Sequence, residues 1–110
     1  MKLKAEPVLT CIVMIVVATA YCTCSHCTAP YDDGYLPDGV TEPVEGRTIA
    51  GPPEWELGTI VYIPDRGVHI VEDRGGAIKG NRIDIYFDSH EDALEFGRQT
   101  LRICILLWGD

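Results

Sequence analysis

Two aspartates joined by a glycine-rich connection are the groups in this chain that are best suited to chemistry. The stretch "VEDRGGAIKGNRIDIYF" (residues 71–87) places Asp73 and Asp84 eleven positions apart, each in an apolar segment typical of a β-strand. The three glycines between them permit backbone angles that let a ligand approach closely. If this loop folds back, the two carboxylates meet at a cleft. There, partial burial and a neighbouring charge raise the pKa of one carboxyl and suit it to general acid catalysis.

The same residues also fit a purely structural role. Aspartate beside glycine is common in turns, so Asp73 would cap a turn. Asp84 would then pair with Arg82 on a solvated strand face. Residue types alone favour this structural interpretation.

Cysteines supply a second candidate site. Cys22, Cys24 and Cys27 fall in "YCTCSHC", whereas Cys11 and Cys104 lie far away in the sequence. Five cysteines permit at most two disulfides and one further thiol, and the pairing does not follow from the sequence.

These cysteines with the adjacent His26 could supply soft ligands for zinc. A structural zinc site usually takes a second ligand pair from elsewhere, and His69 and His90 are weak candidates for it. A disulfide among the cysteines, or simple loop thiols, is favoured, so no metal site and no cofactor are predicted. A nucleophilic cysteine is another option. Cys27 and the nearby His26 would splay apart in extended backbone, which leaves His69 or His90 as its partner.

Composition and charge narrow the class of protein. The chain has 110 residues, 46% hydrophobic and 24% charged, which is typical of one globular domain with or without a targeting segment. Its 17 acidic and 9 basic residues give a net charge of −8. Binding to nucleic acid needs a basic face, so no nucleic acid partner is predicted.

The first twenty residues allow two interpretations. Lys2 and Lys4 precede an apolar run that ends in a small-x-small site at 18–20, as in a cleaved signal peptide. The run is short for a membrane span, which needs roughly 20 residues. Alternatively, the β-branched "VMIVVATAY" forms a buried strand, which Glu6 in the otherwise basic start slightly favours.

Strand patterns follow a turn-rich stretch at 22–47. Strands are expected at 47–50, 59–63, 68–73, 81–87 and in the closing "LRICILLW". In 81–87 the alternation turns Ile83, Ile85 and Phe87 to one face and Arg82, Asp84 and Tyr86 to the other.

One segment, "SHEDALEFGRQT", predicts a helix. Ser89 can cap it, with Asp92 completing a capping box, and Ala93, Leu94 and Phe96 supply an apolar face. Six or so short strands with one helix predict a small, mostly β barrel.

Four segments together resemble a known family: "ATAYCTC", "GRTIAGPPEWELGTIVYIP", "VEDRGGAIKGNRIDIYF" and "EDALEFGRQTLRICIL". They look like the 3D domain, which is named for three aspartates and is similar to the catalytic part of MltA-type lytic transglycosylases. The most specific part is Asp-x-Gly-Gly-Ala-Ile-x-Gly-Asn-Arg-x-Asp. The resemblance implies a small six-stranded double-psi β-barrel with one short helix over residues 12–110. Residues 1–11 would be a leader or tail, with an export signal extending to residue 20 as the alternative.

The resemblance also implies an activity. Family members of this kind cleave the β-1,4 bond between N-acetylmuramic acid and N-acetylglucosamine in peptidoglycan and leave a 1,6-anhydro ring, in wall remodelling or lysis. By position, Asp84 matches the catalytic acid and Asp73 the supporting aspartate, and the reaction requires no cofactor. Residues expected to contact the glycan are Gly75, Gly76, Lys79, Asn81, Tyr86 and Trp55. Trp55 beside Pro53 fits equally well as a core residue.

One departure from the family pattern bears on activity. The first family aspartate should follow "TIA", but Gly51 and Pro52 stand there, with Glu54 close by. Two alternatives therefore stay open: a non-catalytic barrel that binds wall carbohydrate, and a wall glycan hydrolase that uses Glu54 or Glu72 as its second carboxylate.

The resemblance also bears on location. The first strand of the family ends in "ATAY", so residues 12–21 are expected in the barrel rather than in a discarded signal. The expected place of action is the cell envelope or outside the cell, or the wall as reached by a phage or mobile-element protein. Membrane association through the apolar N-terminus stays open, and no oligomeric state is predicted.

Overall fold

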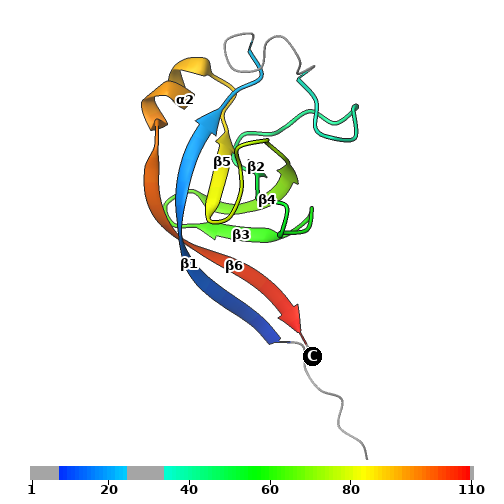
Figure 1. Cartoon of the computed structure of the whole chain (residues 1–110), viewed down its shortest axis with the longest axis vertical. Coiled ribbons are helices and arrows are strands. Elements are labelled where there is room, and N and C mark those ends of the chain that lie inside the picture. The colour runs from blue at the N-terminus through cyan, green and yellow to red at the C-terminus, as the bar shows by residue number, and fades with distance from the viewer. Residues whose placement is uncertain (1–7, 25–33, 110) are drawn as a thin grey trace, which may run out of the picture.

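The computed structural model describes residues 8–24 and 34–109. Within them lie β1 (Val8–Tyr21), β2 (Thr48–Ala50), β3 (Ile60–Ile63), β4 (Gly67–Asp73), β5 (Arg82–Tyr86), α2 (His90–Phe96) and β6 (Gln99–Gly109). The strands close into a barrel in the order β1-β5-β2-β4-β3-β6 (Figure 1). The predicted fold class, a small six-stranded double-psi β-barrel with one short helix, is confirmed.

Two of the strand pairs are parallel, and they determine which distant segments meet. β1 runs parallel to β5, with Val17 opposite Arg82 and Tyr21 opposite Tyr86. β2 runs parallel to β4 and antiparallel to β5, so it lies between them. Parallel neighbours require a long crossover connection. The barrel therefore brings the end of β1 beside a segment more than sixty residues further along the chain.

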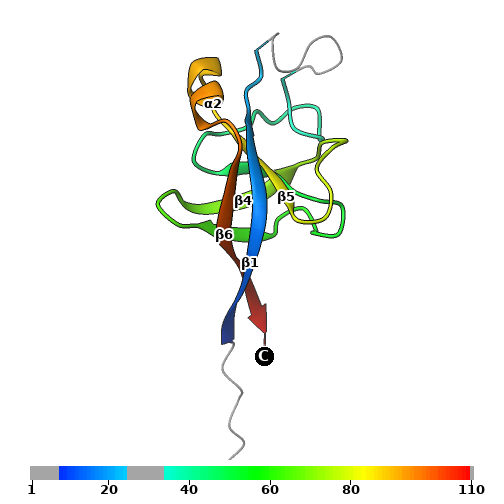
Figure 2. The same ribbon diagram turned by 60° about the vertical axis from the view of Figure 1, so that its left-hand side comes forward.

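β1 and β6 form a long antiparallel ladder that runs from Val8 opposite Gly109 to Ala18 opposite Gln99. Its outer half leaves the barrel as a twisted two-stranded arm (Figures 1 and 2). Residues of this arm are largely exposed, whereas the inner half of β1 is partly buried, with Val16 and Ala18 in the core. A disulfide joins Cys11 to Cys104 within the ladder. The expected strand over 12–21 is thus part of a longer one.

Alternation along the strands builds the core. Ile83 and Ile85 of β5 lie inside the barrel with Phe87, as their spacing predicts, whereas Asp84 lies on the other face. Branched side chains dominate this interior, which suits strands that pack on their inner face. The members with at most 2% exposure are Val16, Ala18, Ile49, Val61, Ile63, Val71, Ile83, Ile85 and Ile103.

The predicted helix forms as α2, and its cap is observed. Ser89 accepts a hydrogen bond from the backbone N–H of Asp92 at 3.2 Å. Ala93 and Phe96 are buried, but Leu94 is 67% exposed, so its expected place in the apolar face is wrong. A helix of seven residues buries a narrow stripe, and Leu94 falls outside it. In the part of the chain that the structure describes, no helix is long and apolar enough to span a membrane.

The interior predicts a large stability difference between two apolar sites. Ile63→Ala leaves a cavity at a side chain that is 1% exposed, so we expect the free energy of unfolding to fall by about 2–5 kcal/mol. Leu94→Ala on the exposed side of α2 should change it by less than about 0.5 kcal/mol. Urea unfolding followed by circular dichroism measures both. Equal losses would contradict this description of the core.

Candidate functional site

The sheet brings Asp73 and Asp84 to either side of one residue. Ala50 of β2 is paired with Asp84 on β5 and with Asp73 on β4. Strands lie about 4.8 Å apart, so residues two strands away have Cα atoms about 10 Å apart. Pairing through β2, rather than folding back of the glycine loop, therefore brings the two carboxylates near one another.

Asp84 is the more perturbed of these acids. Asp84 is half-buried, and this burial raises its pKa to about 6; the charge of Asp73 adds to this effect. Two partners oppose it. The hydroxyl of Thr19 donates a hydrogen bond to Asp84 Oδ1 at 2.9 Å, and the charge of Arg82 also favours the ionised form. Near neutral pH both the protonated and the ionised form of this carboxyl are populated, as a proton donor requires.

Asp73 is held by two donors. The Tyr21 hydroxyl donates to Asp73 Oδ2 at 2.8 Å, and the backbone N–H of Arg74 donates to Oδ1 at 2.8 Å. The second bond is the turn-capping role expected from the sequence. The first fixes the carboxylate against a strand from the other end of the chain. Asp73 is therefore a fixed negative charge beside Asp84.

The charges of both acids act on Tyr21. Burial raises the pKa of its hydroxyl far above the ordinary value, and the charges of Asp73 and Asp84 raise it further. The hydroxyl consequently stays protonated and acts as a donor. Its ring contacts Tyr86 edge to face, with centroids 5.5 Å apart.

The sequence did not single out Thr19 or Tyr21. Both fall in the apolar segment "ATAY", where Thr19 and Tyr21 are two residues apart and so share one face of the strand. That spacing was the available signal. Their partners, more than fifty residues away, follow only from the order of the strands in the barrel.

The expected glycan-contacting residues fall into two groups. Gly75, Gly76 and Lys79 are exposed on the loop between β4 and β5. This loop is closed over the buried Ile78, whose N–H donates to Gly75 O at 3.0 Å. It is a packed turn rather than freely bending backbone.

The second group has structural contacts. Asn81 accepts a hydrogen bond from Val17 N–H on its carbonyl at 2.9 Å, which ties the end of the loop to β1. Tyr86 is 6% exposed, so its ring offers little stacking surface. Burial raises the pKa of the Tyr86 hydroxyl, and Asp88 adds to the shift.

Trp55 packs against the core and sits in a clamped loop. Arg74 donates from its guanidinium to the carbonyls of Gly51 at 3.1 Å, Pro52 at 2.7 Å and Trp55 at 2.6 Å. Because Arg74 follows Asp73, one turn fixes both a candidate acid and the loop from 51 to 58. The alternative assignment of Trp55 as a core residue agrees with its contacts.

The position of the missing family aspartate is crowded. A Cβ atom at Gly51 would lie 2.9 Å from Val71 Cγ1 and 3.3 Å from the ring of Trp55. Glu54 is exposed in the following loop. Glu72 accepts from Arg47 Nε at 2.8 Å and from the Thr48 hydroxyl at 2.7 Å, so it is engaged elsewhere.

The fold brings one histidine next to two of the cysteines. Cys22 and Cys24, just after β1, lie beside His90 at the start of α2. His69 is buried elsewhere, with Nδ1 3.0 Å from Gly67 O, and burial lowers its pKa. Cys27 and His26 lie outside the described residues. Of His69 and His90, the structure brings His90 to the cysteines.

Comparison with known proteins gives one family and three relatives. The 3D domain family model matches residues 47–107. Bacillus subtilis (strain 168) YabE, whose name links it to cell wall shaping, is 37% identical over 98 residues, 86% of this chain and 23% of YabE. The cell wall-binding protein YocH of that organism is 42% identical over 50 residues, 46% of this chain and 17% of YocH. YorM, an uncharacterized protein derived from its SPbeta prophage, is 38% identical over 94 residues, 80% of this chain and 40% of YorM.

The match therefore spans less than half the length of each relative. Among solved structures, the crystal structure of MltA from E. coli is similar with a TM-score of 0.54 and 17% identity. That similarity covers 73% of this chain and 29% of the MltA chain. It shows a common fold, in agreement with the predicted resemblance.

Crowding at Gly51 predicts a penalty for any side chain there. Gly51→Ala should lower the free energy of unfolding by about 1–3 kcal/mol, because its Cβ would press on Val71. Gly51→Asp should cost at least as much, because it also places a carboxylate at a buried position. Gly76→Ala is the matched control, since a Cβ there meets nothing within 4 Å. Urea unfolding of the three variants tests this, and a Gly51→Ala variant as stable as the parent would refute it.

Proposed function

The chain belongs to the 3D domain family, and on that premise we propose that it is a lytic transglycosylase that cleaves peptidoglycan. The bond cleaved is the β-1,4 linkage between N-acetylmuramic acid and N-acetylglucosamine, with a 1,6-anhydro product. One observation carries the proposal. A half-buried aspartate, Asp84, has a pKa of about 6 and lies across one strand from a second, fixed aspartate.

Asp84 serves both proton transfers in turn. In its protonated form it gives a proton to the glycosidic oxygen as the bond from that oxygen to the anomeric carbon breaks. The resulting carboxylate takes a proton from the 6-hydroxyl of the muramic acid, whose oxygen bonds to the same anomeric carbon. No water is consumed, and Asp84 ends the cycle protonated. A pKa near 6 suits this use as acid and then base.

Asp73 supports the reaction through its charge. Held by Tyr21 and by the N–H of Arg74, it contributes to the raised pKa of Asp84. A fixed negative charge would also stabilise the positive charge that develops on the sugar ring as the bond breaks. Tyr21 is a positioning residue in this scheme.

The surroundings favour transglycosylation over hydrolysis. A glycosidase needs a second carboxylate placed either to activate water or to act as nucleophile. The two candidates from the sequence are poorly suited: Glu72 is bound by Arg47 and Thr48, and Glu54 is exposed in its loop.

For substrate contact we assign the exposed turn rather than the buried rings. Gly75, Gly76 and Lys79 are exposed beside Asp73 and are proposed to contact the glycan. Asn81, Tyr86 and Trp55 are proposed to position the loop and the strands beneath it. The substrate places the proposed site of action outside the cytoplasmic membrane, at the wall.

A second candidate is a barrel that binds wall carbohydrate without cleaving it. Two observations favour it: a Cβ at Gly51, where the family's first carboxylate is expected, would press on Val71, and the relative YocH is named a cell wall-binding protein. Retention of the protein on purified wall without release of fragments, unaffected by Asp84→Asn, would support this candidate and reject the first.

The catalytic proposal predicts the effect of Asp84→Asn. Asparagine keeps the size of the side chain but transfers no proton, so we expect release of soluble fragments from purified peptidoglycan to fall by at least about 100-fold. Mass spectrometry of the fragments from the parent protein should show anhydro products, one water lighter than hydrolysis products. Asp92→Asn, in an exposed position of α2, is the matched control and should keep full activity. Fragments of the hydrolytic mass, or activity retained in Asp84→Asn, would contradict the proposal.

Thr19→Val predicts a shift of the pH profile. The Thr19 hydroxyl stabilises the ionised form of Asp84 and so lowers its pKa. Without it the pKa rises, and the acid stays protonated to higher pH. Turnover of the parent should fall as pH rises, with a midpoint near pH 6. Turnover of Thr19→Val should fall with a midpoint about one pH unit higher.

Thr100→Val, on the exposed part of β6, is the control for Thr19→Val and should leave the profile unchanged. Initial rates of fragment release between pH 4 and about 9 give the midpoints. A profile of Thr19→Val that coincides with the parent's, or lies at lower pH, would show that the hydroxyl does not govern the catalytic acid.

A further inference from the structure

We propose that Cys22, Cys24 and His90 form a zinc-binding site that fastens the end of β1 to the start of α2. This site is separate from the pair of aspartates and does not depend on the activity proposed above. Two thiols and an imidazole are ligands that zinc prefers over harder cations such as calcium and magnesium.

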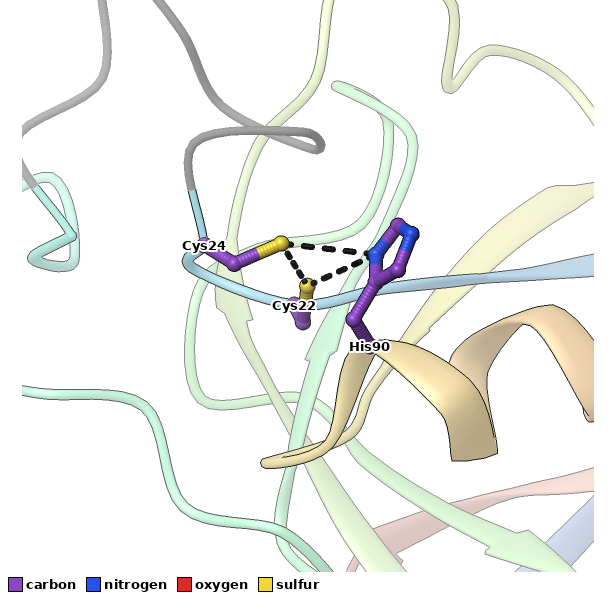
Figure 3. A group of neighbouring side chains, drawn as sticks. All are labelled: Cys22, Cys24 and His90. Atoms are coloured by element: carbon purple, nitrogen blue, oxygen red, sulfur yellow. Dashed lines mark hydrogen bonds between the residues drawn. The ribbon is translucent and has the colours of Figure 1, made fainter.

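The geometry places the three donor atoms around one point. Figure 3 shows both sulfurs directed at the same ring nitrogen, with Cys24 Sγ 3.3 Å and Cys22 Sγ 3.6 Å from His90 Nδ1. All three donor atoms lie within 4.8 Å of one another. In a tetrahedral zinc site with Zn–S of about 2.3 Å and Zn–N of about 2.0 Å, sulfur and nitrogen ligands lie about 3.5 Å apart. Both observed sulfur–nitrogen distances are close to this separation.

The two sulfurs require a small adjustment. They are 2.8 Å apart, whereas tetrahedral zinc separates two sulfurs by about 3.8 Å. Cys24 is half-buried and lies after the end of β1, so rotation of its side chain can increase the distance between the two sulfurs. The same 2.8 Å exceeds the length of a disulfide bond, which is about 2.05 Å.

The ligands come from two rigid parts of the fold. Cys22 follows directly after Tyr21, is fully buried, and is therefore fixed by the packing of the barrel. His90 begins α2, immediately after the capping residue Ser89. Preformed ligands on separate elements are what a structural metal site uses, because binding then stabilises the folded state over the unfolded one.

Convergence of two thiols on one nitrogen also argues against a catalytic Cys–His pair. A nucleophilic cysteine needs one thiol beside its base, and a second sulfur at a similar distance would compete for the same nitrogen. As a metal site, two thiolates neutralise the charge of the zinc. The contact would hold the chain where it leaves β1.

The test is metal binding by the whole chain, measured without reference to any activity. Protein purified with zinc and passed through gel filtration should carry about one zinc per chain by elemental analysis. EDTA should remove this zinc. Cobalt in place of zinc should give the visible absorption of a tetrahedral ion and a sulfur-to-cobalt charge-transfer band. Zinc should also raise the melting temperature, because it binds the folded form.

Two variants remove ligands and one serves as control. His90→Asn and Cys24→Ser should each weaken zinc binding by at least tenfold, with loss of the cobalt spectrum. Glu91→Gln, at the neighbouring exposed position of α2, should bind as the parent does. If Cys24→Ser does not fold, the cobalt spectrum of the parent and the zinc affinity of His90→Asn, at a half-buried position, still decide the matter.

Three results would overturn the proposal. The first is a parent protein that retains less than about a tenth of a zinc per chain, given the strong affinity of thiolate sites. The second is zinc bound equally well by His90→Asn. The third is recovery of Cys22 and Cys24 as a disulfide-linked pair in a digest of the protein alkylated under denaturing conditions. None of these outcomes bears on fragment release from peptidoglycan, so the two proposals fail separately.

Discussion

The parallel pairing of β1 with β5 is the constraint on which the candidate site depends. It places Thr19 opposite Asp84 and Tyr21 opposite Tyr86, while Ala18 and Ala20 face the interior opposite Ile83 and Ile85. Side chains alternate along a strand, so a slip of one residue would exchange the two faces. Both aspartates would then lose their hydroxyl donors, and the core would receive a threonine and a tyrosine. Because the core fixes the register, it also fixes the site.

A carboxyl in this setting has an energetic consequence. Burial raises the pKa of Asp84 to about 6, so the folded state prefers the protonated acid more strongly than the unfolded chain does. The stability contributed by this preference is fully present at acid pH and is lost as pH rises through about 6. Thr19 and Arg82 limit the loss by favouring the ionised form. The site is therefore balanced between two protonation states at the expense of some stability at neutral pH.

Much of the barrel could be predicted, because local sequence patterns indicate where its strands and its helix lie. Strict alternation in 81–87 predicted which side chains of β5 face the core, and Ser89 marked the start of the helix. The glycine loop was expected to fold back and bring the two acids together, yet it packs over Ile78, and pairing through β2 brings the acids together. Local chemistry identified the loop's turn residues but not the side chain it would cover.

The remaining features depend on contacts between distant segments, for which periodicity holds no information. Neither the hydroxyl donors from β1, nor the crowding of Gly51 by Val71, nor the approach of His90 to Cys22 follows from residues near one another in the sequence. A parallel crossover is needed for each donor from β1, and its partners depend on the order of strands in the barrel. The two acids could thus be identified from the sequence, but not the groups that set their protonation.

The central claim is that the fold holds Asp84 as an acid with a raised pKa, and its titration tests this directly. Carbon-13 NMR of the side-chain carboxyl, assigned by its disappearance in Asp84→Asn, should give a midpoint near pH 6. A midpoint near the ordinary aspartate value of about 3.9 would contradict the account, because the carboxyl would then hold no proton to donate at neutral pH.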